Sequence, residues 1–146
     1  MREDGTLTAI DGAAMLAQVE AWSAIDVGRA INPRLVEVQI EGGLVQGLGF
    51  ALYEEMVWDG PRLVNPSLMD YKIPTSADTP PIHSIVIEDP EPSGPFGAKG
   101  AGEIGLNPVP AAIANALAQA VGGVSPAIPL TPERVLARLE GDGDAP

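Results

Sequence analysis

Residues 32–52 read NPRLVEVQIEGGLVQGLGFAL, and this stretch decides the main helix of the fold. Asn32 followed by Pro33 is a typical helix start, because asparagine caps free backbone N–H groups and proline suits the first helical position. Apolar side chains then recur every four residues and form one stripe: Val36, Ile40, Leu44, Leu48 and Leu52. The pattern predicts a helix of about 20 residues at about 34–53.

The same helix contains four glycines: Gly42, Gly43, Gly47 and Gly49. Each interior glycine costs about 1 kcal/mol relative to alanine. We therefore expect another group to lie very close to the helix backbone. Gln46 is the functional side chain on the face that carries Gly42 and Gly49. It either meets a ligand there or is an ordinary residue facing solvent.

The rest of the chain predicts an α+β fold, a small mixed or antiparallel sheet packed by helices at about 34–53 and 108–121. The expected shorter elements are a strand at 19–27, a hairpin at 56–64 around Asp59-Gly60-Pro61, a strand at 82–88 and a capped helix from Thr131-Pro132 to Leu139. With no internal repeat or long linker, 1–146 is predicted to be a single domain. Residues 1–15 have no firm pattern, 1–17 are an atypical start, and 141–146 are an expected flexible tail.

Composition excludes several function classes. The net charge is −12, which argues against nucleic acid and against an anionic membrane surface. No apolar run approaches the roughly 20 residues of a membrane span, and the N-terminus lacks signal-peptide features, so a cytoplasmic location is expected. The chain has no cysteine and one histidine. It therefore lacks ligands for an iron–sulfur cluster or a self-contained zinc site, and a metal would have to come with a cofactor.

The glycine-rich segment GPFGAKGAGEIG, residues 94–105, is the strongest candidate for chemistry. Its backbone can approach a ligand closely, and free amides ahead of a helix can receive an anion. Residues 100–105 match G-x-G-x-x-G by letter, but they neither follow a strand directly nor open a helix. Glu103 is its lone carboxylate and could act as a general base if a partner covers it. The plain alternative is a structural loop with a local Lys99–Glu103 ion pair.

Four motifs in order resemble the molybdenum hydroxylases, the xanthine dehydrogenase and aldehyde oxidase family. They are DVGRAINP at 26–33, IEGGLVQGLG at 40–49, MDYKIP at 69–74 and GAKGAGE at 97–103. The similarity is to the C-terminal part of the molybdopterin-binding subunit, and PLTPERV at 129–135 matches its usual end. It covers roughly residues 18–140, whereas the complete subunit is several times longer.

This resemblance implies a molybdenum-cofactor-binding domain that supplies part of an active site. Glu103 would be the catalytic base, and Gln46 would hydrogen-bond an oxygen ligand of the metal. The other implied cofactor-binding residues are Gly47, Ala98, Lys99, Gly100, Ala101 and Gly102. The implied cofactor is molybdenum–molybdopterin, with the cytosine dinucleotide form as one option. Molybdenum would be held through the pterin, with no direct protein ligand.

The resemblance also implies partners. They are the remainder of the molybdopterin-binding subunit, an iron–sulfur subunit, an FAD subunit and a small-molecule substrate, an aldehyde or an N-heterocycle. The isolated chain is expected to be inactive. Two other interpretations stay open: a non-catalytic remnant or assembly module without bound metal, and a loop that binds a nucleotide by itself.

Overall fold

The computed structural model describes residues 20–121 and 127–140. Its helices and strands form a mixed α/β fold, which confirms the predicted fold class. The elements are β1 (Ala21–Asp26), α2 (Pro33–Leu52), β2 (Trp58–Asp59), β3 (Arg62–Leu63), β4 (Ile82–Ile87), the 3-10 turn η1 (Pro95–Gly97), α3 (Val109–Val121) and α4 (Pro132–Leu139). The expectations for residues 1–17 and 141–146 lie outside the described residues.

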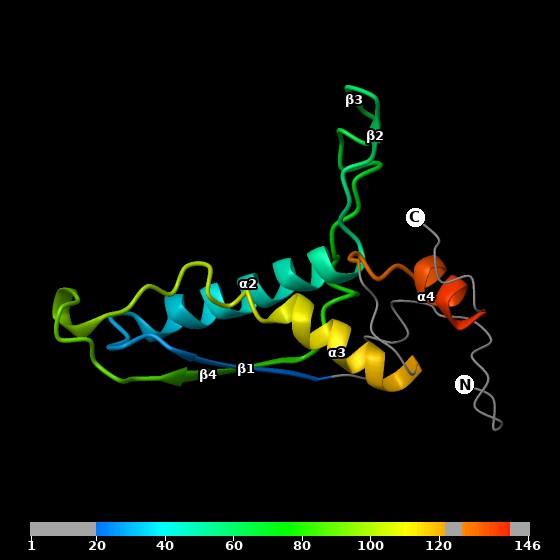
Figure 1. Ribbon diagram of the computed structural model, residues 1–146. Coiled ribbons are helices and arrows are strands. Elements are labelled where there is room, and N and C mark those ends of the chain that lie inside the picture. Colours follow the sequence, from blue (N-terminus) through cyan, green and yellow to red (C-terminus); the bar gives the residue numbers. More distant parts are fainter. Residues whose placement is uncertain (1–19, 122–126, 141–146) are drawn as a thin grey trace.

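The strands form two separate two-stranded sheets. β1 and β4 pair in parallel with Ala21 opposite Ile82 and Asp26 opposite Ile87, while β2 and β3 form the predicted antiparallel hairpin. A parallel pair needs a long connection, which α2 and the following loops provide. Figure 1 shows α2 and α3 on the same side of the β1–β4 pair and the hairpin projecting away from the end of α2.

The long helix α2 forms as its sequence predicts. The Asn32 side chain accepts a hydrogen bond from Leu35 N (3.2 Å), and Pro33 occupies the first turn. Ile40, Leu44 and Leu48 from the apolar stripe are buried. Ile40 joins Ile25 and Val27 of the β1 segment in one cluster, so burial of this stripe holds the helix against the sheet.

Two glycines of α2 permit a close approach by the chain itself. A Cβ placed on Gly47 would lie 2.6 Å from the Cβ of Val109, and one on Gly43 would lie 3.0 Å from Leu106 N. The expected close neighbour is thus confirmed, and it is the segment that enters α3. Gly42 differs, because a Cβ there would meet nothing within 4 Å.

The C-terminal helix α4 is anchored to the end of α2. Thr131 caps α4 as predicted, and Leu130 N donates a 2.6 Å hydrogen bond to Ala51 O. Arg134 donates to Pro129 O (3.0 Å) and to Glu55 Oε1 (2.8 Å). The anchor therefore joins segments about 80 residues apart in sequence.

Candidate functional site

The glycine-rich loop is tied to the end of β1 by backbone hydrogen bonds. Lys99 N donates to Val27 O, and Arg29 N donates to Gly97 O, both at 2.8 Å. Gly28 and Gly97 have positive φ (64° and 82°), which glycine adopts without steric cost. A Cβ on Gly28 would lie 2.4 Å from Gly97 O, so the two segments cross closely here. These contacts place residues 98–102 beside the start of α2.

Lys99 pairs with Asp26 at this crossing. Its Nζ lies 2.5 Å from Asp26 Oδ2 and 3.7 Å from Asp89 Oδ2. The hydrogen bond from Lys99 lowers the pKa of Asp26, helped by the N–H of Gly28, and the same carboxylate raises the pKa of Lys99. The alternative prediction of a Lys99–Glu103 ion pair is therefore wrong. The backbone hydrogen bond from Lys99 to Val27 holds Lys99 beside the end of β1, where its side chain meets Asp26.

A cavity of about 280 Å³ lies between this loop and the first half of α2. Four of the residues predicted to bind cofactor line it: Ala98, Lys99, Ala101 and Gly102. Arg29, Asn32 and Gln39 also line it and bring polar groups to its wall. Sequence reasoning did not assign Arg29 or Gln39 to this site. Their positions in the sequence could have indicated them. Arg29 follows directly after the predicted strand, and Gln39 lies on the same helix face as Gln46.

The backbone between Lys99 and Glu103 is open. Within the described part of the chain, the N–H groups of Gly100, Ala101 and Gly102 make no hydrogen bond. A Cβ on Gly100 or Gly102 would meet nothing within 4 Å, and neither residue has a positive φ. The fold of the described chain thus does not require glycine at either position. Unused amides beside open space can bind an anion or a flat ligand.

The remaining predicted site residues lie outside this cavity. Gln46 is exposed on α2, and Gly47 is buried beneath Val109. Packing against α3 accounts for Gly47, and its contact with a cofactor stays a prediction. Glu103 is exposed, and no ion pair to its carboxylate is found among the described residues.

Other polar candidates have structural roles. The His83 ring stacks on Trp22 with ring centroids 4.9 Å apart, and its Nε2 lies 3.1 Å from Glu20 Oε2. The hydroxyl of Tyr71 donates a 2.7 Å hydrogen bond to Glu54 Oε2. This hydrogen bond raises the pKa of Tyr71. Among residues 20–121 and 127–140, no three His, Cys, Asp or Glu side chains are grouped so that they could hold a metal ion.

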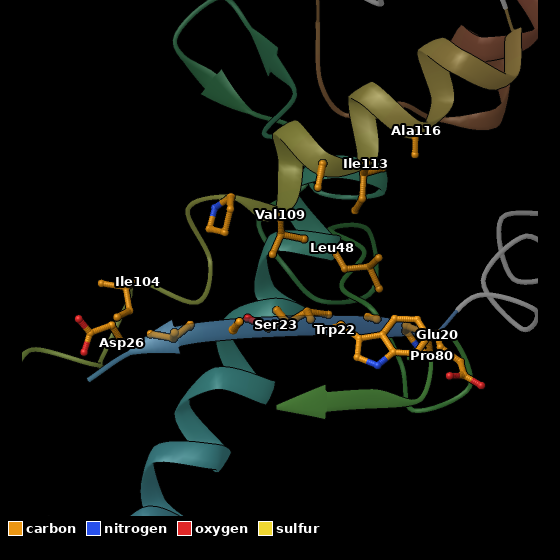
Figure 2. A pocket seen from close by; sticks show the side chains of 16 residues that line it. Glu20, Trp22, Ser23, Asp26, Leu48, Pro80, Ile104, Val109, Ile113 and Ala116 are labelled. Carbon is orange, nitrogen blue, oxygen red and sulfur yellow. The ribbon is translucent and has the colours of Figure 1, made fainter. Parts of the chain in front are cut away.

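A second hollow, of about 570 Å³, runs between β1 and α3. Figure 2 shows Val109, Ile113 and Ala116 pointing from α3 toward β1, with Asp26 and Ile104 at one end and Glu20 at the other. Its lining is mostly apolar.

None of the described helices is long and apolar enough to cross a membrane.

Comparison with known proteins gives consistent matches. The family model of the molybdopterin cofactor-binding domain matches residues 11–80. The xanthine dehydrogenase molybdenum-binding subunit of Escherichia coli O157:H7 is 45% identical over 112 residues, which is 75% of this chain and 15% of that subunit. The nicotine 6-hydroxylase large subunit of Paenarthrobacter nicotinovorans is 40% identical over 126 residues, 84% of this chain and 15% of that protein.

Solved structures agree with the sequence matches. Quinoline 2-oxidoreductase from Pseudomonas putida 86 superposes with a TM-score of 0.77 at 39% identity, over 86% of this chain and 16% of that chain. The aldehyde oxidoreductase from Desulfovibrio gigas gives a TM-score of 0.74 at 34% identity, over 86% and 14%. The chain thus spans about 15% of the length of the relatives that it matches.

Proposed function

Because this chain belongs to the xanthine dehydrogenase and aldehyde oxidase family of molybdenum hydroxylases, we propose that it completes a molybdopterin active site and supplies its catalytic base, Glu103. The relatives are molybdenum-binding subunits and oxidoreductases, and this chain corresponds to one segment of them. The remainder of the molybdenum-binding subunit is the partner that would enclose the site.

The open backbone of residues 100–102 is the observation that best supports cofactor binding. Three amides without a hydrogen bond and two glycines facing empty space fit the anionic, planar molybdopterin. The residues that would hold it are Ala98, Lys99, Ala101 and Gly102, which line the cavity beside α2, and Gly100, whose N–H is open. When bound, the cofactor supplies the redox chemistry of an oxidative hydroxylation, and the protein binds and orients it. The ion pair of Lys99 with Asp26 keeps this loop in place.

In this proposal Glu103 accepts a proton at its carboxylate while the substrate is hydroxylated. Its carboxylate is suited to this task because no cation pairs with it within the described chain. Apolar surface supplied by the partner would remove water and make the carboxylate a better proton acceptor. Gln46, exposed on α2, would donate a hydrogen bond toward the cofactor and orient it.

The relatives also support finer parts of the proposal. Nicotine 6-hydroxylase and quinoline 2-oxidoreductase are named for N-heterocycles, and aldehyde oxidoreductases are also similar. We therefore propose an N-heterocycle or an aldehyde as substrate. An iron–sulfur subunit and an FAD subunit would carry the electrons away, and the cofactor could carry a cytosine dinucleotide.

The test is Glu103→Gln in the enzyme assembled with the rest of the subunit. Turnover should fall by at least about 100-fold, the usual contribution of general acid–base catalysis, while molybdenum content stays unchanged. Glu140→Gln is the matched control, because Glu140 is also exposed and lies at the end of α4. Full turnover in Glu103→Gln would favour the non-catalytic remnant, and loss of molybdenum would make Glu103 a cofactor-holding residue and not the base.

A further inference from the structure

The edge of β1 away from β4 is open. Ala21 N and Val27 N donate to carbonyls of the β4 segment, so alternate residues of β1 face that neighbour. The N–H and C=O groups of Trp22 and Ala24 therefore point to the opposite edge. Within residues 20–121 and 127–140, no strand pairs with that edge. An edge of this kind is a template for another strand.

The apolar groove of about 570 Å³ follows this same edge. Every residue of β1 lines it, α3 forms its wall, and Leu44 and Leu48 of α2 contribute to its base. Figure 2 shows the α3 side chains directed toward the strand. The groove thus offers backbone hydrogen bonds on one side and apolar side chains on the other, the combination used in recognition by strand addition.

The described chain leaves too much apolar surface uncovered for this groove to face water. None of the 13 residues of α3 is buried, although nearly all are apolar. On the far face of the sheet, away from α2, Ile85 is 47% exposed and Ile87 is 46% exposed. Parallel sheets normally have both faces covered, and large exposed apolar patches mark interaction surfaces.

We propose that a strand-forming, apolar segment of the remaining part of the molybdenum-binding subunit adds to the free edge of β1 and lies in this groove. This rests on the proposed function, which supplies the partner. We choose this partner because of its size. The relatives are more than six times longer than the segment that they share with this chain, so the rest of such a subunit offers enough surface to cover the groove. A single short segment could not cover both the groove and the far face of the sheet.

This docking would also cover the active-site carboxylate. The groove ends at Asp26 and Ile104, and Ile104 is the residue next to Glu103. A partner strand that reaches this end brings protein surface to Glu103, which the described chain leaves exposed. The groove and the catalytic loop then form one continuous interface with the same partner.

The chain has no cysteine, so single thiols can report on the groove. Ala112→Cys places a thiol in its wall, and Ala111→Cys is the control, exposed on the same helix but outside the groove lining. Labelling with a maleimide is timed on the isolated chain and on its complex with the polypeptide that carries the rest of the subunit. In the complex, Cys at position 112 should react at least about tenfold more slowly, and the control should change little.

Hydrogen exchange on the same complex tests the strand pairing. The amides of Trp22 and Ala24 should gain at least about tenfold protection on assembly. Equal labelling rates in the free chain and the complex would overturn the proposal, as would protected thiols without protected amides. A thiol and amides that are already protected in the isolated chain would also overturn the proposal. The occupant of the groove would then be residues 1–19 if the chain sediments as a monomer, or a second copy of the chain if it sediments as a dimer.

Protection of the groove and turnover of the Glu103→Gln enzyme test the docking mode and the catalytic assignment separately. An unprotected groove together with loss of turnover in Glu103→Gln would overturn the docking mode alone. A protected groove together with full turnover in that variant would overturn the catalytic assignment alone.

Discussion

Two alanine substitutions on one helix should have clearly different effects on stability. Gly42→Ala places a methyl group where nothing lies within 4 Å, so the higher helix propensity of alanine should stabilise the chain by up to about 1 kcal/mol. Gly47→Ala has the same gain, but its methyl group would lie 2.6 Å from the Cβ of Val109 and 3.0 Å from Leu106 O. Neither atom can move by a side-chain rotation, so α3 must shift away from α2.

Overpacking of this kind costs about 1–3 kcal/mol. After the gain in propensity, Gly47→Ala should lower the free energy of unfolding by up to about 2 kcal/mol. Because both variants share that gain, they should differ by the overpacking cost, about 1–3 kcal/mol. Urea unfolding followed by circular dichroism measures the free energy of unfolding of both variants. An unchanged slope of that free energy against urea concentration shows that the same cooperative unit unfolds. Gly47→Ala as stable as Gly42→Ala would refute the close approach of α2 and α3.

Three further predictions concern the loop and the caps. Gly102→Ala should leave the stability of the isolated chain within about 1 kcal/mol of wild type, because its methyl group meets no neighbour, yet lower the molybdenum content of the assembled enzyme; unchanged metal content would show that this loop does not hold the cofactor. Lys99→Met should lower the free energy of unfolding near neutral pH by removing the partner of Asp26. Because Lys99 lowers the pKa of Asp26 in the fold, urea titrations should find this loss in full above about pH 4 and shrinking as the pH falls further, and a loss that is constant down to pH 2 would contradict the pairing. Thr131→Ala should cost about 1 kcal/mol in the same assay by removing the cap of α4, and no change would mean that this cap contributes nothing.

The proposed enzyme chemistry depends on how this chain meets its partner. The cavity beside α2 is lined by residues of the glycine-rich loop that are proposed to hold the cofactor. Gln46 and Glu103 lie outside this cavity and are exposed. A second polypeptide surface is therefore needed to bring all of these groups to one ligand. The open edge of β1 beside Ile104 is where we infer that this surface attaches.

Local sequence signals were sufficient for most helices and strands. Asn32-Pro33 and Thr131-Pro132 begin helices, and Gly60-Pro61 forms the turn of the hairpin. Each signal works through hydrogen bonds or dihedral preferences within a few residues, so it does not depend on the rest of the fold. The family also follows from sequence, because four motifs in fixed order need no coordinates to be matched.

Contacts between distant segments could come only from the tertiary structure. Lys99 pairs with Asp26 across 73 positions and not with nearby Glu103, and β1 runs parallel to β4. The glycines of α2 predicted a close neighbour without saying which, and packing identified it as the entry to α3. Such contacts depend on where the chain returns in space, and local propensities do not specify that path. The sequence thus determined the elements and the family, while the fold determined which residues share a cavity, an ion pair or an open edge.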